Sequence, residues 1–171
     1  MSALVRGARF VSVLFGGVFA GFLVAVLVLE LSLRSYDGRV YAQVRQVELD
    51  SLDRLAGATL LPALIATALL AVAAFRTREG GRWPVLSALA LLVLVFVLTM
   101  VVNYPINNDQ ADWNVQAPPA GWADDRDRWQ IAHAVRTVAA VCAFGCLILA
   151  RRSDTRVDTP AIERPAGALA S

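Results

Sequence analysis

The chain has 171 residues, of which 57% are hydrophobic, and it carries 16 basic residues, 14 acidic residues and one histidine. This hydrophobic share exceeds the roughly 45–50% of an ordinary soluble domain, which excludes a soluble globular protein. The high apolar share predicts an all-α integral membrane protein. The numbers of basic and acidic residues are nearly equal and the sequence has no basic patch, so we expect no nucleic-acid partner.

Four apolar runs are each long enough to cross a bilayer, which takes about 20 helical residues. They cover residues 10–33, 55–75, 83–104 and 130–150. A secretory signal is a competing interpretation of the first run, but this run exceeds the roughly 7–15 residues of a signal core, so we expect it to be retained. The sequence predicts a four-helix bundle over residues 1–152 and a disordered tail over residues 153–171.

The distribution of charge predicts the orientation of the bundle. All basic residues are arginines, and nine of the 16 lie in the N-terminal arm, the short loop 76–82 and the tail. Ten of the 14 acidic residues lie in the remaining segments. Because arginine concentrates on the cytoplasmic side, we expect both ends to be cytoplasmic. The absence of lysine and the high alanine content favour a bacterium with a GC-rich genome, and the short inner loops suit its plasma membrane.

The two outer connections have different patterns. Segment 34–54 has apolar residues at near-helical spacing, which predicts that it extends the second helix beyond the membrane. Segment 104–128 combines prolines with Trp113 and Trp122, which predicts an irregular lid lying on the membrane interface.

A group of polar and aromatic residues is predicted near the outer boundary, when about 20 residues are counted from each inner arginine. The group comprises Glu30, Asn103, Asn107, Trp129, His133 and Arg136. Trp129, His133 and Arg136 are four and three residues apart, so they lie on one helix face. Charged groups in a membrane turn inward and pair, and Glu30 is the expected partner of Arg136.

Structural interpretations of the same residues stay open. Glu30 is also placed to meet Arg34 at the interface, Arg136 is long enough to snorkel outward, and the asparagines that flank Pro105 are able to cap a helix end. We expect Cys142 and Cys146 to be buried small residues rather than a redox pair. The sequence contains no cluster typical of a metal site, and one histidine cannot supply two haem ligands.

Two segments carry a family resemblance: NYPIN at residues 103–107 and RWQIAHAVR at residues 128–136. They resemble the anthrone oxygenase-like family of small four-helix membrane proteins, and the likeness covers about residues 10–152. The resemblance implies oxygenation of electron-rich polycyclic phenols without a cofactor.

The residues then support two hypotheses. In the first, an apolar phenol or quinol enters from the outer leaflet, His133 takes its proton, and Arg136 with Asn103 and Asn107 steadies the oxyanion. Glu30 would hold Arg136 or orient His133, and Trp129 would contact the substrate.

In the second hypothesis, the chain is a non-catalytic membrane module that binds a lipid or a partner protein. The polar group is then a structural clasp between helices. The small residues Gly16, Gly17 and Gly21 would allow close helix packing, either within the chain or in a homo-oligomer.

Overall fold

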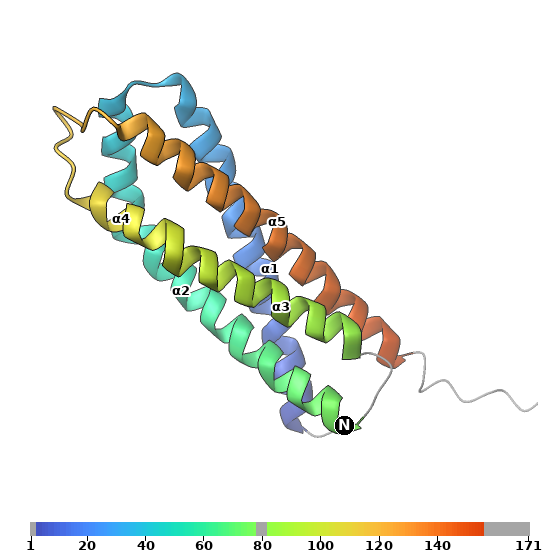
Figure 1. Cartoon of the computed structure of the whole chain (residues 1–171). Coiled ribbons are helices and arrows are strands. Elements are labelled where there is room, and N and C mark those ends of the chain that lie inside the picture. Colours follow the sequence, from blue (N-terminus) through green and yellow to red (C-terminus); the bar gives the residue numbers. More distant parts are fainter. Residues whose placement is uncertain (1–2, 78–81, 156–171) are drawn as a thin grey trace, which may run out of the picture.

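The computed structural model describes residues 3–77 and 82–155, and the described residues are helical apart from short connections. The helical elements are α1 (Ala3–Ser32), a short turn η1 (Leu33–Ser35), α2 (Gly38–Thr77), α3 (Arg82–Leu98), the π-helical turn η2 (Thr99–Asn103), α4 (Tyr104–Ala111) and α5 (Trp122–Thr155). The chain rises and descends in turn, so that α1 begins and α5 ends at the same end of the bundle (Figure 1). The predicted all-α four-helix fold is confirmed.

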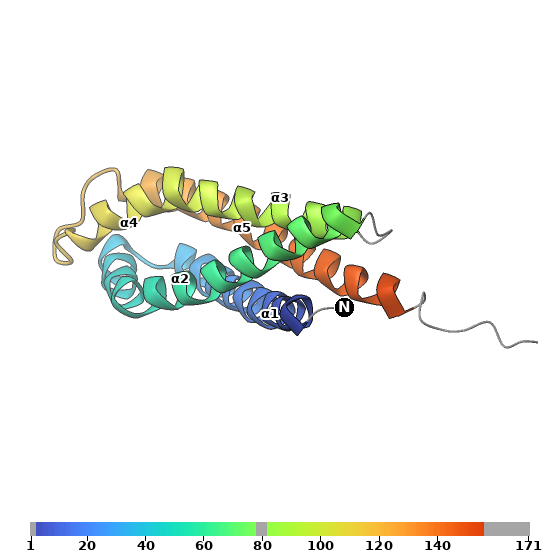
Figure 2. The ribbon, with the colours of Figure 1, turned by 90° about the horizontal axis from the view of Figure 1, so that it is seen from below.

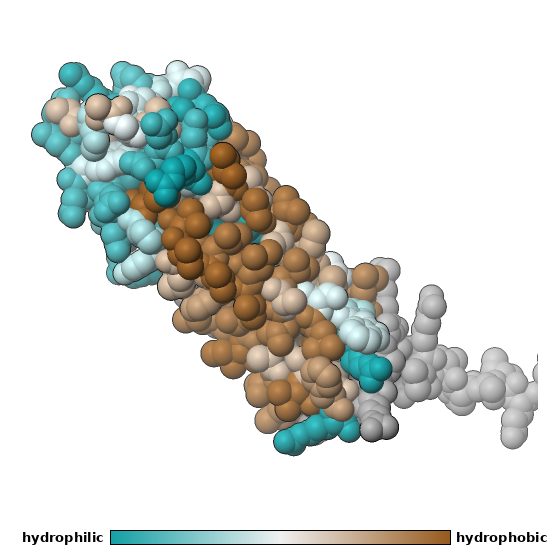
Figure 3. All heavy atoms as spheres, viewed as in Figure 1, coloured by the Kyte–Doolittle hydropathy of each residue, from teal (hydrophilic) through white to brown (hydrophobic). Residues whose placement is uncertain are grey.

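Four helical stretches are long and apolar enough to cross a membrane: Ala3–Ser35, Gly38–Arg76, Arg82–Ala111 and Trp122–Ala150. The chain is therefore a multi-pass membrane protein. Hydrophobic residues cover the middle of the face that Figure 3 shows, and hydrophilic residues cover the end that bears the η1 and α4–α5 connections. At this end, α4 and α5 lie on one side of the bundle and α1 and α2 on the other (Figure 2).

The second helix is much longer than its apolar run. It begins at Gly38, directly after Asp37, whose Oδ1 accepts hydrogen bonds from the backbone N–H groups of Arg39 and Val40 at 3.0 and 3.1 Å. This is an N-cap, since the carboxylate satisfies amides that have no partner within the helix. The predicted helical extension over residues 34–54 is confirmed from Gly38 onward.

The lid predicted over residues 104–128 is mostly helical. Its irregular part is limited to residues 112–121, between α4 and α5. That this segment lies on the membrane interface stays a prediction, but its tryptophans turn inward. Both pack on Tyr41 of α2, with ring centroids 6.4 Å away for Trp113 and 5.6 Å for Trp122. Tyr41 is fully buried, so the extension of α2 supplies an apolar surface that the indoles cover.

Small residues allow close packing in the half of the bundle away from the α4–α5 connection. This packed half comprises Gly16, Gly17, Ala63, Ala88 and Ala143, together with Leu147. A Cβ on Gly17 would lie 2.9 Å from the ring of Phe144, and one on Gly16 would lie 3.2 Å from Leu147. These glycines therefore allow α1 and α5 to approach closely within one chain.

Helix α5 begins at Trp122, eight residues before the predicted start of the fourth span, with Asp124 and Asp125 in its first turn. It continues to Thr155, past the predicted end of the bundle at residue 152. The rest of the predicted disordered tail, residues 156–171, lies outside the described residues.

Candidate functional site

Buried polar side chains gather near the end of the bundle that bears the two connections. This polar half comprises Glu30, Arg45, Glu48, Asn103, Asn107, Gln110, Gln130, His133, Arg136 and Thr137. They come from all four membrane-crossing stretches. By contrast, Ser12 and Thr67 are buried nearer the packed half and donate to carbonyls of their own helices. The polar half is therefore where contacts between helices depend on hydrogen bonds and charge.

Arg45 of α2 is the centre of an ion cluster. Its Nη1 lies 3.1 Å from Glu30 Oε1 and 2.6 Å from Glu48 Oε2. Its remaining nitrogens donate to Gln110 Oε1 and Asn107 Oδ1, both at 2.9 Å. A buried guanidinium needs this kind of complete partnership, because an unpaired buried charge is strongly destabilising.

The expected pair of Glu30 with Arg136 is not the one that forms. Glu30 bonds Arg45, and Gln130 Nε2 donates to its Oε2 at 3.0 Å. Arg136 instead contacts Thr99 and His133. Arg45 lies on the predicted extension of the second helix, and the side of α2 that carries it faces α1.

Trp129 connects the ion cluster to the histidine. The guanidinium of Arg45 lies 4.2 Å above the Trp129 ring, and the ring of His133 stacks on the same indole at 4.7 Å and 10°. The indole Nε1 donates to Asn107 Oδ1 at 2.6 Å. Trp129 is therefore held by a cation–π contact, a stacking contact and a hydrogen bond, which fixes the side of the site next to His133.

The bonds of His133 define its tautomer. Its Nε2 lies 3.0 Å from the carbonyl oxygen of Leu23, and its Nδ1 lies 3.0 Å from Arg136 Nη2. A carbonyl only accepts and a guanidinium only donates, so Nε2 carries the proton and Nδ1 is the acceptor. Both ring nitrogens of the buried, neutral imidazole are thus engaged.

Arg136 is bonded differently from Arg45. Its Nη1 donates to Thr99 Oγ1 at 3.0 Å and its Nη2 donates to His133. Its Nε is buried without a hydrogen-bond partner among the described residues. No described carboxylate lies within 4.0 Å of its nitrogens. Arg136 is therefore a mostly buried cation that neutral groups hold in place.

A π-helical turn positions the third helix against this group. Pro105 has no N–H and would clash with the preceding turn of a regular α-helix. The turn η2 relieves this constraint with a wider bond, from the N–H of Tyr104 to the carbonyl oxygen of Thr99. Such turns often occur at functional sites. Here it brings Thr99 to Arg136, while Asn103 Nδ2 donates to the backbone carbonyl of Trp129 at 3.2 Å.

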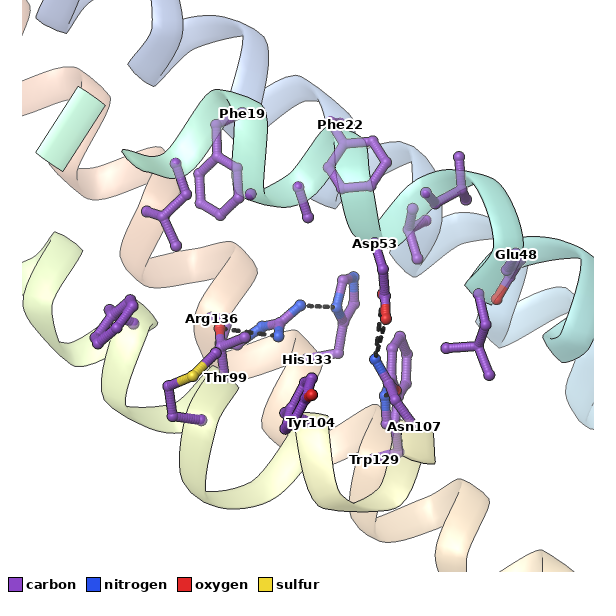
Figure 4. Close-up of a pocket in the computed structure, with 18 of the residues that line it drawn as sticks. Phe19, Phe22, Glu48, Asp53, Thr99, Tyr104, Asn107, Trp129, His133 and Arg136 are labelled. Atoms are coloured by element: carbon purple, nitrogen blue, oxygen red, sulfur yellow. Dashed lines mark hydrogen bonds between the residues drawn. The ribbon is translucent and has the colours of Figure 1, made fainter. Parts of the chain in front are cut away.

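A cavity of about 250 Å³ lies between these side chains. His133, Arg136, Thr99, Asn107 and Trp129 line it on the side of η2, α4 and α5, and Figure 4 shows Phe19 and Phe22 of α1 facing them. Most of the lining is aliphatic or aromatic. Small-molecule sites have this character, mainly apolar with a few converging polar groups.

The cavity opens sideways, between α2 and the α3–α4 stretch. Its lining residues Asp53 and Leu61 on α2, and Met100 and Tyr104 on the facing stretch, are exposed on the surface of the bundle. Leu61 and Met100 are 47% and 43% exposed, so apolar side chains border the opening. The cavity is therefore open on the side of the bundle.

Of the six residues predicted as a site, four line this cavity: Asn107, Trp129, His133 and Arg136. The other two, Glu30 and Asn103, are buried behind them. Glu30 bonds the lining residue Arg45, and Asn103 bonds Trp129. Cys142 and Cys146 are free, and Cys142 is exposed, so the expectation that it is buried is wrong.

Sequence reasoning missed a stripe of α2. Arg45, Glu48 and Asp53 line the cavity together with Leu49, Leu52, Ala56, Gly57 and Leu60. These positions recur at three- and four-residue spacing, which is the signature of one helix face. The stripe continues without a gap from Arg45 to Leu60, and this periodicity was the signal that could have assigned its polar residues to the site. Asp53 is the carboxylate nearest the opening, and Asn107 Nδ2 lies 3.2 Å from both of its oxygens.

Comparison with protein-family models matches residues 54–146, just over half of the chain, to the model described as anthrone oxygenase. No curated protein and no solved structure matches the chain. Among the described residues, no group of three or more histidine, cysteine or acidic residues is arranged to hold a metal ion.

Proposed function

Because the chain belongs to the anthrone oxygenase family, we propose that it binds a flat, apolar phenol or quinol in the cavity and oxygenates it with dioxygen. The family match shows that the chain is a membrane protein of the anthrone oxygenase family. The substrate, the reaction and the roles of the residues are proposals supported by the geometry of the cavity.

The bonding of Arg136 is the observation that carries this proposal. Its guanidinium borders an apolar cavity and has a buried N–H group without a partner and no carboxylate within ion-pair distance among the described residues. A guanidinium whose hydrogen-bond partners are all neutral is able to bind an anionic ligand. A substrate oxyanion would complete its bonding in the same way that two carboxylates complete the bonding of Arg45.

The walls and the opening of the cavity indicate the kind of substrate. A volume of about 250 Å³ lies just below the roughly 300–1,000 Å³ of typical small-molecule sites, so it suits a small rigid molecule. Phe19, Phe22 and Trp129 offer aromatic surfaces to a planar ring system. Because exposed apolar side chains border the opening, the substrate would arrive from the membrane, and the distribution of arginines favours the outer leaflet of a plasma membrane.

The reaction balances without a cofactor. A polycyclic phenol of the anthrone type has an acidic methylene group, and loss of one proton gives an aromatic oxyanion. Dioxygen then oxidises the methylene carbon to a carbonyl, so that anthrone and dioxygen give anthraquinone and water. Arg136 would stabilise the oxyanion, and Asn107 and Trp129 would form the adjoining wall. His133 would position Arg136, because its Nδ1 already accepts a hydrogen bond from that residue.

The test measures dioxygen uptake and quinone formation by the purified protein in lipid vesicles supplied with anthrone. We expect one dioxygen consumed per carbonyl formed. Replacing one oxyanion-binding donor typically lowers kcat by about 10²–10³, and we expect a loss of this size in Arg136→Gln. Arg128→Gln is the matched control on the same helix, because Arg128 is 69% exposed, pairs with Asp125 and does not line the cavity. Wild-type turnover in Arg136→Gln would contradict the assignment of Arg136, and no turnover in the wild type would contradict the oxygenase function.

A non-catalytic membrane module is the second candidate. The observation in its favour is the ion cluster of Glu30, Arg45 and Glu48, which joins α1 to α2 as a clasp would. Such a protein would bind a lipid, a partner protein or a second copy of the chain. The same experiment separates the two functions, since a pure binding module would retain anthrone without consuming dioxygen.

A further inference from the structure

We propose that Asp53 is the base that removes the proton from the substrate. This inference rests on the proposed function and assigns a step within it. The base must carry an available lone pair beside the cavity. Asp53 is a carboxylate at the opening of the cavity and does not belong to the family-matched segment, which begins at residue 54.

His133 is not available for this step as it is bonded. Its Nε2 donates to the carbonyl of Leu23, and the lone pair of Nδ1 is occupied by Arg136 Nη2 at 3.0 Å. A proton on Nδ1 would break that hydrogen bond and would place a second positive charge beside the guanidinium. A substrate hydroxyl would first have to displace Arg136, the group that would bind its oxyanion.

Glu48 is the other carboxylate that lines the cavity, but its charge already has a partner. Its Oε2 lies 2.6 Å from Arg45 Nη1, which also contacts Glu30. Its Oε1 has no hydrogen-bond partner among the described residues, but a proton on Glu48 would remove one of the two carboxylate charges that neutralise the buried Arg45. Asp53 has no arginine or histidine nitrogen within 4.0 Å among the described residues. The amide of Asn107 donates to it and leaves other lone pairs unused.

Asp53 and Arg136 form a pair of opposite charges that are held apart. Asn107 holds the carboxylate on one side, and Thr99 with His133 holds the guanidinium on the other. In Figure 4 the Asp53 side chain points toward Asn107 and the Arg136 side chain points toward His133, while Glu48 lies farther along α2. A substrate between them would direct its oxygen to the cation and its acidic hydrogen to the carboxylate.

The step itself is a proton transfer. The C–H bond of the anthrone methylene breaks, its electron pair passes into the ring system, and the carbonyl oxygen becomes an oxyanion beside Arg136. The proton forms an O–H bond with the carboxylate of Asp53. The subsequent oxidation consumes dioxygen, so the proton transfer proceeds in its absence and is open to separate measurement.

The experiment follows deuterium exchange from heavy water into the methylene group of anthrone under nitrogen, with the protein in lipid vesicles. We expect the wild type to catalyse exchange. The exchange rate of Asp53→Asn should be at least ten-fold lower than that of the wild type, although the variant should still bind anthrone. The asparagine keeps an acceptor for Asn107 but has no basic lone pair. Asp53→Glu should restore part of the rate. Asp50→Asn, an exposed position on the same helix that does not line the cavity, is the matched control.

The outcomes separate this proposal from the oxygenase function. Exchange by Asp53→Asn at the wild-type rate, or loss of exchange only in Glu48→Gln or His133→Ala, would overturn the assignment of Asp53 even if dioxygen uptake is normal. Conversely, a wild type that exchanges deuterium in an Asp53-dependent way but consumes no dioxygen in air would support Asp53 and contradict the oxygenase function.

Discussion

The packed half and the polar half join the same helices by different means. In the packed half, Gly16 and Gly17 let α1 lie directly against Phe144 and Leu147 of α5, and contact between apolar atoms fills the space. In the polar half, α1 meets α2 and α5 through the bonds of Glu30, and a cavity remains beside them. Close packing leaves no room for a ligand, whereas a rigid polar frame supports a cavity without filling it.

The two arginines of the polar half sharpen this comparison. Arg45 contacts two carboxylates and two amide oxygens, so it completes the frame. Arg136 has only neutral partners and faces the cavity. We therefore expect Arg45 to matter chiefly for stability and Arg136 chiefly for binding and turnover.

The largest effect on stability is expected for Arg45→Met. Removing this cation leaves Glu30 and Glu48 buried without a counter-charge, which typically costs about 3–5 kcal/mol. Unfolding with a denaturing detergent in mixed micelles measures this loss. Adding Glu30→Gln and Glu48→Gln should recover much of it, because the amides remove the unpaired charges. A loss below about 1 kcal/mol in the single variant would mean that the cluster does not hold the polar half together.

An intermediate effect is expected in the packed half for Gly17→Leu. A Cβ at this position already meets the Phe144 ring at 2.9 Å, so a leucine overfills the contact, at a typical cost of about 1–3 kcal/mol. Gly21→Leu is the matched control on the same helix, because a Cβ on Gly21 meets nothing within 4 Å. Equal stability of the two variants in the same unfolding assay would show that α1 and α5 do not depend on close contact at Gly17.

The smallest effect on stability is expected for Gly57→Leu. Gly57 lines the cavity within α2, and a Cβ there meets nothing within 4 Å. Replacing a helical glycine removes a cost of roughly 0.5–1 kcal/mol, so stability should stay level or rise slightly. The leucine should nevertheless weaken anthrone binding by filling the cavity, as measured by titration in vesicles. Unchanged affinity would place the ligand elsewhere.

Much of the fold could be predicted because membrane spans depend on composition and length, both of which are read directly from the sequence. The apolar runs indicated the four crossings, and the periodicity of segment 34–54 indicated the long α2. The positions of Trp113 and Trp122 could not be predicted in this way. Their inward packing depends on the ring of Tyr41, which is in reach only because α2 extends beyond its apolar run.

The candidate site was predictable where its residues share one helix. Trp129, His133 and Arg136 lie on one face of α5 and line the cavity together, as their spacing indicated. The partner of Glu30 was not predictable, since pairing between helices depends on how each helix is rotated. Spacing along one helix contains no information on that rotation. Arg45 was therefore not assigned to the site, although the helical extension that carries it was predicted.

The central claim is that the cavity beside Arg136 is a binding site for an aromatic ligand, and native mass spectrometry of the detergent-purified protein mixed with a hydroxylated anthraquinone tests it most directly. We predict one ligand bound per wild-type chain and its loss in Arg136→Gln, with similar thermal stability for the two ligand-free proteins. An empty wild-type chain, or equal binding by Arg136→Gln, would contradict the claim.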